Sequence, residues 1–564
     1  MSAHWQYITV SVRLVSKENT YALSGIHLIF KDPARKISFD FILTISYIPD
    51  LELYKILINS GNDADDHNES TDTVSWYGGK VINNIALSTY HSKLTKYLSY
   101  FRRNGFNFIP YDIINKKSND TNFDNLSLLK LDLVPNIKQQ FIHKNQAYYK
   151  PIMFHNNRIN NELKNLPIII KSYPFNFTNS MIFSNFLSNG TINYVFKDYI
   201  GYLSDTQYLE NMIGGVVLND KHHTSIGLVL GNVKKLNGDG DLTFIISWNT
   251  IWKVLMEYDS KLNKYSSTIL KLNRLSTSMT TTIATPSRKY TSVFPITIRN
   301  SVASSWGSCV YYNHNTLMTN FHVLQPFIGK HEVSCEIHIS PTCILTITNT
   351  DSIITPFRNI DLSFIKLSMK NIVLVNNRNI PAKPIRKCYK YDVGDEVISQ
   401  GFGLFYNLTN ISPLESQGII SCKVKLPITY KVLESNSMII TSSSCWNGSS
   451  GGGIFKKSSS STSSSTRLEF VGLICSNAQI KIPNLLNENY DPESRIISHE
   501  SSDDIIEKLS KFSLILPIEI IDYCYTHKVS QSHNAIPPSI NPKIKDIWQL
   551  KSFHNDIVID STKF

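Results

Sequence analysis

The sequence predicts an all-β protein whose two halves both form closed sheets. Short β-branched and aromatic runs, such as FDFILTISYI at 39–48 and DLSFIKL at 361–367, alternate in polarity or are wholly apolar. Asn, Asp, Gly and Pro bound these runs, which is typical of buried antiparallel strands. Helical periodicity is rare, and ISWNTIWKVLMEY at 246–258 and PIEIIDYCY at 517–525 are the best candidates. Such strands usually close as barrels or sandwiches.

Composition predicts a globular chain of more than one domain. The 564 residues are 42% hydrophobic and 18% charged, which suits about two to four domains. The net charge of +11 is compatible with nucleic-acid binding, but the lysines are scattered and no zinc-finger spacing, RNP-like aromatic motif or P-loop accompanies them. We therefore expect no nucleic-acid partner, no cofactor and no metal. No run of 18 apolar residues exists, so no membrane span is expected.

A Ser/Thr-rich segment divides the chain. NRLSTSMTTTIATPSRKYTSV at 273–293 is poor in apolar residues and predicts an exposed linker. This boundary predicts a first domain over 1–272, a second over 294–525 and a C-terminal tail over 526–564. The eight cysteines all lie in the second half without a CxxC pair, and no export signal is visible. We therefore expect reduced thiols in an intracellular compartment.

The two halves share a series of motifs. LSLLKL at 126–131 is similar to LSFIKL at 362–367. Gly214 follows the start of the first motif by 88 residues, and Gly451 follows the start of the second by 89. The similar strands SIGLVLGN and FVGLICSN come after the two Gly-Gly pairs. Several matches in the same order indicate an internal duplication.

Ser450 in CWNGSSGGGIF is the candidate nucleophile. A serine hydroxyl needs a base, a carboxylate that orients the base, and donors for the developing oxyanion. Glycine two residues before the serine lets the backbone turn, so that the amides of Gly448 and Ser450 point at one oxygen. Alone this motif is weak, because Gly/Ser loops are common and the serine-rich run at 458–465 shows that serine is abundant here.

His322 and Asp361 are the candidate base and carboxylate. His322 follows an apolar run in TLMTNFHVLQPF, where a structural histidine at a barrel end is the simpler interpretation. Asp361 begins a buried strand, whereas its competitor Asp351 lies in the polar turn TNTDS and ranks behind it. The order His…Asp…Ser is found on double β-barrels and argues against the G-x-S-x-G elbow of α/β-hydrolases, whose acid and histidine follow the serine.

This order and spacing, with SSWGSCV at 304–310, resemble the chymotrypsin/trypsin-like serine peptidases. GFGLF at 401–405, SQGIIS at 416–421, GSSGG and FSLILPIEII are similar to the peroxisomal (glyoxysomal) leader-peptide-processing protease family. The resemblance covers 296–525 and is thin over 1–270. It implies a chymotrypsin-like double β-barrel in the C-terminal half, preceded by a degenerate protease-like β domain.

The resemblance also implies a role for each candidate residue. His322 would be the general base, Asp361 its orienting carboxylate and Ser450 the acylated nucleophile. The backbone amides of Gly448 and Ser450 would form the oxyanion hole. Ser444 would lie at the floor of the primary specificity pocket, where an uncharged residue argues against a trypsin-like preference for Arg or Lys. The simpler interpretation of Ser444 is a serine-rich loop.

The first half lacks the corresponding residues. Aligning the repeats places Asn125 against Asp361 and Ile213 against Ser450. His91 is the nearest histidine in spacing and fits poorly. Because isoleucine cannot attack a carbonyl, we expect this half to be inert as a protease and to pack, bind substrate or recruit a partner.

The resemblance implies protein substrates. The chain would trim targeting presequences from peroxisomal proteins and process itself, with the linker at 273–293 as the exposed cleavage region. The C-terminal STKF departs from a Ser-Lys-Leu-like signal, and RLVSKENTYAL at 13–23 lacks the downstream His or Gln of the N-terminal signal. A peroxisomal location therefore depends on the resemblance, with the cytoplasm as the alternative.

Two other functions stay open. An HtrA/Deg-like quality-control protease shares the order of the three residues, but the 42 residues after Asp522 are too few for the PDZ module of those enzymes. An inactive protease-fold scaffold is the alternative from another class, against which the three candidate residues argue. Whether the chain forms a homo-oligomer is left open.

Overall fold

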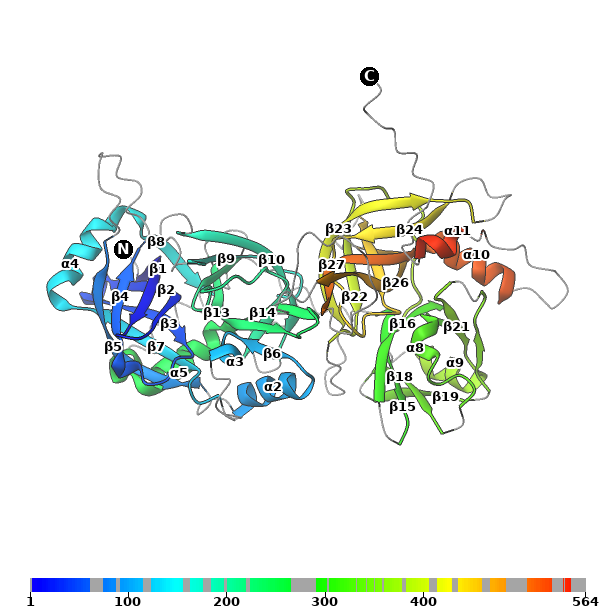
Figure 1. The fold of residues 1–564 in the computed structure, drawn as a ribbon, viewed down its shortest axis with the longest axis horizontal. Coiled ribbons are helices and arrows are strands. Elements are labelled where there is room, and N and C mark those ends of the chain that lie inside the picture. Colours follow the sequence, from blue (N-terminus) through cyan, green and yellow to red (C-terminus); the bar gives the residue numbers. More distant parts are fainter. Residues whose placement is uncertain are drawn as a thin grey trace, which may run out of the picture. The chain divides into compact units, whose positions relative to one another are not determined.

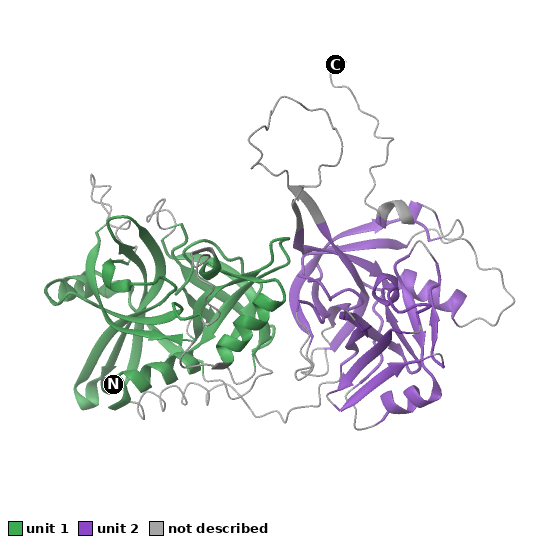
Figure 2. Ribbon diagram, turned by 60° about the horizontal axis from the view of Figure 1, so that its bottom comes forward, with its two compact units in different colours: residues 1–285 green, residues 286–564 purple. Residues whose placement is uncertain are grey.

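In the computed structural model the chain divides into two compact units, unit 1 over residues 1–285 and unit 2 over residues 286–564 (Figure 2). The structure describes residues 3–60, 75–87, 92–114, 123–155, 163–175, 184–196, 200–219, 224–264, 291–301, 304–330, 332–340, 342–348, 350–357, 360–377, 382–404, 413–428, 435–458, 467–482, 505–529, 541 and 543–548.

Unit 1 is built on a sheet that closes twice (Figure 1). Its described strands are β1 (His4–Val15), β2 (Thr20–Asp32), β3 (Ile37–Ser46), β4 (Lys55–Asn59), β5 (Tyr77–Ala86), β6 (Asn107–Ile109), β7 (Ser127–Leu133), β8 (Lys150–Phe154), β9 (Pro167–Ser172), β10 (Phe186–Val195), β11 (Gly201–Ser204), β12 (Val216–Asn219), β13 (Thr224–Lys234) and β14 (Gly240–Ser247). The order β1-β2-β3-β7-β5-β4 returns to β1, and the order β9-β10-β11-β14-β13-β12 returns to β9. Strand β8 pairs with both β1 and β13 and so joins the two rings.

Unit 2 has one open sheet and one closed barrel among its described residues. Its strands are β15 (Val293–Arg299), β16 (Ser304–Asn313), β17 (Thr316–Thr319), β18 (Ser334–Ser340), β19 (Cys343–Ile347), β20 (Ser352–Ile354), β21 (Ser363–Lys366), β22 (Glu396–Gly401), β23 (Leu414–Lys425), β24 (Asn436–Thr441), β25 (Gly453–Ser458), β26 (Arg467–Ile482) and β27 (Ile505–Pro517). The first sheet has the order β19-β18-β15-β16-β17-β21-β20, and the barrel has the order β22-β23-β24-β27-β26-β25.

One strand order recurs in every ring. The first three strands are consecutive neighbours, and the sixth, fifth and fourth then follow, as in β9-β10-β11-β14-β13-β12 and in β22-β23-β24-β27-β26-β25. In the open sheet of unit 2, β15-β16-β17 continue to β21 on one side, while β18 and β19 lie on the other. The predicted all-β class and the chymotrypsin-like double β-barrel of the C-terminal half are confirmed.

The described helices are few and short beside the strands. They are α2 (Ser92–Arg103), α3 (Tyr111–Ile114), α4 (Pro135–Lys144), α5 (Trp248–Tyr258), α6 (Ser260–Lys264), α8 (Phe321–Leu324), α9 (Met369–Val375), α10 (Ile518–Lys528) and α11 (Lys543–Trp548). The helices predicted at 246–258 and 517–525 are confirmed as α5 and α10. Ser247 caps α5 by accepting a hydrogen bond from the Thr250 amide (3.2 Å). No helix in the described ranges is long and apolar enough to cross a bilayer.

Two elements extend past the predicted domain boundaries. Strand β15 begins at Val293, inside the expected linker, because Val293 pairs with Val310 of β16. Helix α10 continues to Lys528, beyond the predicted end of the domain, and so takes in the first residues of the expected tail. The rest of the linker, at 273–290, and the serine run after Ser458 lie outside the described residues.

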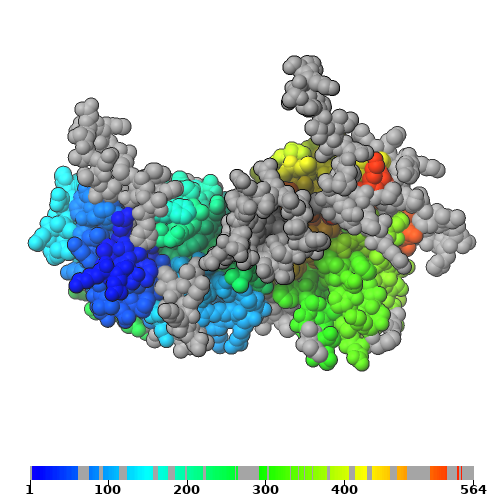
Figure 3. Space-filling view, in the orientation of Figure 1, coloured from blue at the N-terminus to red at the C-terminus, as the bar shows by residue number. Residues whose placement is uncertain are grey.

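Apolar clusters lie against both sheets of unit 2. Fully buried Phe294, Tyr311 and Leu317 belong to the core of the first sheet. Fully buried Ile439 and Ile454 of the closed barrel belong to a second cluster, which also includes Val310 and Phe364 of the first sheet. In the space-filling view the coloured side chains close over the strands of the first sheet, so its core is hidden from this face (Figure 3). A site in this unit must therefore lie where loops leave the strands rather than inside a barrel.

Candidate active site

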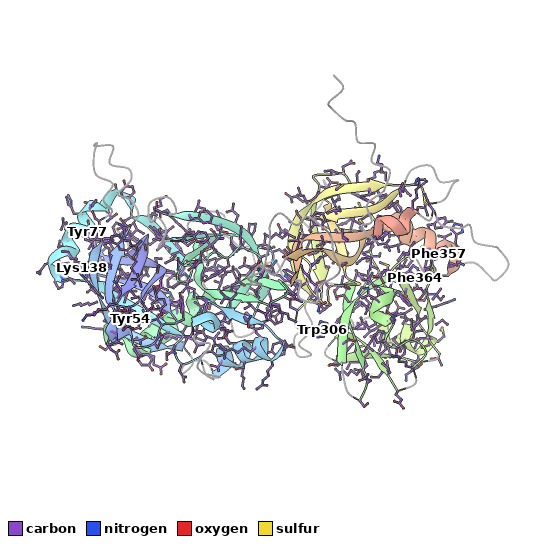
Figure 4. The ribbon with its side chains drawn as sticks, in the orientation of Figure 1. Tyr54, Tyr77, Lys138, Trp306, Phe357 and Phe364 are labelled. Atoms are coloured by element: carbon purple, nitrogen blue, oxygen red, sulfur yellow. The ribbon has the colours of Figure 1, made fainter. Side chains whose placement is uncertain are left out.

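The loop of Ser450 needs glycine at two positions. Gly448 and Gly451 have φ values of +92° and +82°, in the left-handed region that L side chains avoid. A Cβ on Gly448 would lie 2.4 Å from Nε1 of Trp306, which is labelled in Figure 4. A Cβ on Gly451 would lie 2.0 Å from the carbonyl oxygen of Ser308. The glycines that flank the predicted nucleophile are thus fixed by backbone shape and by close packing against strand β16.

Ser308 of β16 holds this loop against the first sheet. Its amide donates to the carbonyl of Ser450 (2.8 Å), and its hydroxyl donates to the carbonyl of Gly448 (2.9 Å). The same hydroxyl accepts a hydrogen bond from the amide of Phe402 (2.8 Å). The carbonyl of Ser308 in turn accepts from the hydroxyl of Thr319 at the end of β17 (2.7 Å). One buried serine therefore connects the closed barrel to the strand that leads to the predicted base.

The structure brings His322 and Asp361 together. His322 lies in α8, directly after β17, and Thr319 of β17 pairs with Ser363, two residues after Asp361. Nδ1 of His322 lies 2.6 Å from Oδ2 of Asp361, and the His322 amide donates to Oδ1 of the same carboxylate (3.0 Å). The two side chains are 48% and 33% exposed, so the carboxylate is less buried than expected. This pair can fix the imidazole tautomer with Nε2 facing outward.

Asn320 and Cys475 connect this pair to Ser450. The side-chain amide of Asn320 donates to the carbonyl of Asp361 (2.8 Å) and to the sulfur of Cys475 (3.2 Å). The hydroxyl of Ser450 donates to the carbonyl of Cys475 (3.2 Å). Burial raises the pKa of the Cys475 thiol well above its usual range, and the negative charge of Asp361 adds to this effect. Among the described residues, the partner of the Ser450 hydroxyl is thus Cys475 and not the ring of His322.

Two amides of the loop have no acceptor. Within the described ranges, neither the Gly448 nor the Ser450 amide donates to a protein group, whereas the amide of Gly451 donates to the carbonyl of Ile474 (2.9 Å). Two such amides, separated by one residue beside a serine hydroxyl, are what a developing oxyanion requires.

Ser444 lies behind the pocket wall. It is 1% exposed, its amide donates to the hydroxyl of Ser416 (3.0 Å), and its carbonyl accepts from the hydroxyl of Ser399 (2.8 Å). A small pocket of about 40 Å³ adjoins Ser450, and the neighbouring residue Cys445 lines it while Ser444 does not. Sequence reasoning missed Lys508, which also lines this pocket from strand β27.

Asp351 is not the partner of His322. It is 6% exposed and accepts hydrogen bonds from the amide of Ser368 (2.7 Å), the amide of Thr348 (3.0 Å) and the side chain of Asn371 (3.0 Å). These hydrogen bonds give Asp351 a structural role in the loops of the first sheet. Across the described part of the chain, no group of three or more His, Cys, Asp or Glu side chains is placed to hold a metal ion.

Unit 1 contains the same loop arrangement around a different side chain. The amide of Ser24 donates to the carbonyl of Ile213 (2.8 Å), and its hydroxyl donates to the carbonyl of Asn211 (2.8 Å). The carbonyl of Ser24 accepts from the hydroxyl of Thr44 (2.5 Å), and a Cβ on Gly214, at φ +78°, would lie 2.1 Å from that carbonyl oxygen. Bond for bond, this is the environment of Ser308.

In this correspondence Ile213 takes the position of Ser450, as the repeat alignment predicts. Asn211, at φ +68°, takes the position of Gly448 and keeps its left-handed backbone. The amide of Gly214 donates to the carbonyl of Val229 (2.9 Å), as the corresponding amide in unit 2 does to Ile474. The backbone of a nucleophile loop is therefore present in unit 1 without a hydroxyl.

Strand register corrects one aligned pair. Thr44 of β3 pairs with Leu129 of β7, and the residue two before Leu129 is Ser127. Ser127, rather than Asn125, therefore takes the position of Asp361 in unit 1. The sequence alignment was two residues off because the similar apolar runs in the two halves match best in a register that the strand pairing does not follow.

The position of the base in unit 1 carries a tyrosine. Three residues beyond Thr44, at the offset of His322 from its own strand, lies Tyr47, which is 4% exposed. Burial raises the pKa of Tyr47, and the negative charge of Glu210 adds to the effect. His91, the nearest histidine by sequence spacing, lies outside the described residues.

Comparison with known proteins bears on unit 2. The family model described as a trypsin-like peptidase domain matches residues 307–460. The matched segment includes His322, Asp361 and Ser450 and supports a peptidase of the trypsin-like class. No curated protein matches the chain.

Several solved structures are similar to part of the chain at low sequence identity. An HtrA-type protease, a variant of AlgW with a bound tripeptide, is 14% identical and covers 42% of this chain (TM-score 0.26). The serine endoprotease from Yersinia pestis is 18% identical and covers 42% (TM-score 0.26), and Deg5 is 13% identical and covers 41% (TM-score 0.25). The chain spans 58% and 61% of the length of the first two, and 85% of Deg5.

Proposed function

We propose that unit 2 is a serine endopeptidase that cleaves protein substrates through Ser450, His322 and Asp361. The observation that carries this proposal is the 2.6 Å contact between Nδ1 of His322 and the Asp361 carboxylate, joined through Asn320 and Cys475 to the Ser450 hydroxyl. The order and type of the three residues, and the trypsin-like family match over them, support the same chemistry.

The proposed reaction starts when the Ser450 side chain rotates. On substrate binding the hydroxyl leaves the carbonyl of Cys475 and gives its proton to Nε2 of His322, while its oxygen attacks the peptide carbonyl. The amides of Gly448 and Ser450 stabilise the oxyanion. His322 returns the proton to the leaving amine, and the acyl-enzyme is hydrolysed by water through the same sequence of steps. Asp361 stays ionised and holds the ring.

Covalent labelling with a fluorophosphonate tests this proposal. The full chain is expected to be labelled at Ser450, and mass mapping must place the adduct there and not on the adjacent Ser449. Ser450→Ala and His322→Ala are expected to abolish labelling while thermal unfolding stays cooperative. A folded wild-type protein that takes no label, or labelling that survives in Ser450→Ala, overturns the assignment.

One observation favours the alternative of an inactive protease-fold scaffold. The Ser450 hydroxyl is bonded to Cys475 rather than to the imidazole among the described residues. If this bond is permanent, the hydroxyl is never activated. The labelling experiment separates the two, because a scaffold stays unlabelled over a range of probe concentrations and pH.

We also propose that unit 1 is a degenerate protease-like domain, related to unit 2 by duplication. Its support is the conserved set of hydrogen bonds around Ser24 with Ile213 in place of a nucleophile. All hydrolysis by the full chain is then expected to vanish in Ser450→Ala. Residual hydrolysis in that variant, after repurification, would assign activity to unit 1.

The finer expectation is that the substrates are targeting presequences of peroxisomal proteins, with self-cleavage in the linker. It depends on the sequence resemblance. Fluorescence localisation of the tagged chain, with presequence processing followed in cells that lack it, tests this expectation. Unprocessed precursors in those cells support it, and normal processing contradicts it.

A further inference from the structure

A pocket next to Ser450 carries a single charged side chain. The lining residues are Cys445, Trp446, Asn447, Ser450, Ile474, Ser476, Asn477 and Lys508. Lys508 is the charged member of this set, and none of the others is a carboxylate. Because the pocket opens beside the proposed nucleophile, it is the place where the side chain preceding the scissile bond would lie.

Lys508 is held at this pocket by the backbone of β27. Lys508 pairs with Gln479 of β26, and pairing continues only at Ser513 with Asn477, so residues 509–512 form a wide bulge. Within this bulge the carbonyl of Ser510 accepts a hydrogen bond from the amide of Cys445 (3.0 Å). The strand that carries Lys508 is therefore fastened to the wall of the pocket.

The charge of Lys508 is not neutralised by the described residues. Other lysines of unit 2 form close ion pairs, such as Lys456 with Asp395 (2.6 Å) and Lys387 with Asp522 (2.9 Å). The side chain of Lys508, which is partly buried, forms no ion pair or hydrogen bond with the described groups. Lys508 lines the pocket, and the described lining holds no carboxylate, so the charge of this lysine favours an anionic occupant.

The remaining walls offer neutral groups. The side-chain amide of Asn477 donates to the carbonyl of Cys445 (2.6 Å), and the buried hydroxyl oxygen of Ser444 behind the wall has no partner among the described residues. A basic side chain in this pocket would meet Lys508 without a compensating charge. Among the described lining residues, a carboxylate would meet one cation and no other charge.

We infer that Lys508 is a specificity-determining residue and that the protein cleaves polypeptides after acidic residues, Asp or Glu. This inference rests on the proposed serine endopeptidase function. It names the substrate class for the Ser450 site. It is compatible with an uncharged Ser444, because Lys508 lines the pocket and Ser444 does not.

Matched peptides test the inference. Four substrates that differ only in the residue before the scissile bond (Glu, Asp, Gln or Lys) are compared by kcat/KM on the full chain. The Glu peptide is expected to exceed its neutral Gln isostere by about tenfold or more, because one charge-assisted contact distinguishes the two. Lys508→Met is expected to bring this ratio close to one, and Lys508→Glu to favour the Lys peptide. Lys511→Met, at an exposed position on the same strand, is the control and should leave the ratio unchanged.

Fluorophosphonate labelling in parallel keeps the two proposals apart. No label and no cleavage in a folded protein contradicts the peptidase function itself. A protein whose Ser450 is labelled, but which cleaves the Glu peptide no faster than the Gln peptide, overturns the acidic preference and leaves the peptidase function standing. A preference for Glu that survives in Lys508→Met assigns it to another residue and overturns the role of Lys508.

Discussion

The hydroxyl of Ser308 donates to the carbonyl of Gly448 (2.9 Å) and accepts from the amide of Phe402 (2.8 Å). Ser308 belongs to the first sheet of unit 2, whereas the two groups that it binds belong to loops of the closed barrel. One side chain of the first sheet thus forms hydrogen bonds with two backbone groups of the barrel loops.

Ser308→Ala is therefore expected to cost about 1–3 kcal/mol of unfolding free energy, because a buried amide and a carbonyl lose their partner. It should also lower kcat, since the Gly448 carbonyl sits in the loop that holds the oxyanion amides. Denaturant unfolding and peptide hydrolysis measure the two effects. Ser305→Ala, at an exposed position of the same strand, should change neither.

Asp361→Asn should reduce kcat by roughly 10⁴-fold, the order found when a serine-protease triad loses this charge. The asparagine amide would face Nδ1 of His322 with a donor and stabilise the wrong tautomer of the ring. The matched change Asp351→Asn should lower the melting temperature, because three bonds to a buried carboxylate weaken, and leave kcat almost intact. The reverse pattern would show that Asp351 orients the base.

Gly448→Ala and Gly394→Ala separate backbone strain from packing. Both glycines have φ of +92°, but a Cβ on Gly394 meets no atom within 4 Å, whereas one on Gly448 meets Trp306 and Phe402. We expect Gly394→Ala to cost about 1 kcal/mol and to keep full activity. Gly448→Ala should unfold at a lower denaturant concentration than Gly394→Ala and should lose its hydrolytic activity. Equal effects of the two changes would contradict the packing of Trp306 against the loop.

Thiol alkylation should distinguish one cysteine from the rest. All eight cysteines are free thiols, and Cys422 is exposed while six of the others are buried. Burial raises the pKa of Cys445 and of Cys335 to about 12, which leaves almost no thiolate at pH 8. Iodoacetamide should therefore modify the native protein first at Cys422. In the unfolded protein it should modify all eight cysteines, even when no reductant is added. Fewer than eight sites in the unfolded chain would reveal a disulfide.

The stability of unit 1 should decrease at acid pH because Asp40 becomes protonated. Burial alone raises the pKa of Asp40, but hydrogen bonds and charge interactions with His27 and Lys138 outweigh it and lower the pKa below the usual 3.8. Because the folded pKa is the lower one, this stabilisation is complete above the unfolded value and is lost as pH falls through the folded value. The denaturation midpoint of wild type should exceed that of Asp40→Asn at neutral pH. The gap should narrow as the pH falls below 3.8 and through the folded pKa of Asp40. A gap that widens in acid would refute this sign.

Much of the candidate site could be predicted from the sequence. Residue types and order were enough to select His322, Asp361 and Ser450, and the glycines around Ser450 marked the turn. The structure places Asp361, and not Asp351, beside His322, because β21 pairs with the strand that ends next to this histidine. The strands could also be predicted, because the alternation of apolar and polar residues depends only on residues that are neighbours in the sequence.

Features that depend on distant pairing could not be predicted. Lys508 reaches the pocket because a bulge interrupts the pairing of β26 with β27, and nothing in the local sequence marks that interruption. Likewise, Ser127 replaces Asn125 as the counterpart of Asp361 because register is set by the partner strand and not by similarity of the motif. Ser308 lies within the SSWGSCV motif, but the sequence does not indicate its hydrogen bonds, because they depend on the loops that lie opposite it.

The persistence of the Ser24 bonds around Ile213 has a consequence for how such folds change over time. These hydrogen bonds form around an isoleucine, so they serve the folding of the loop and do not require a reactive side chain at its tip. The outward-facing side chains of the loop can then be substituted while its backbone conformation stays the same. In the N-terminal half, Ile213→Ser would place a hydroxyl on a loop that already has the required backbone. The imidazole would still be missing, because residue 47 is a tyrosine.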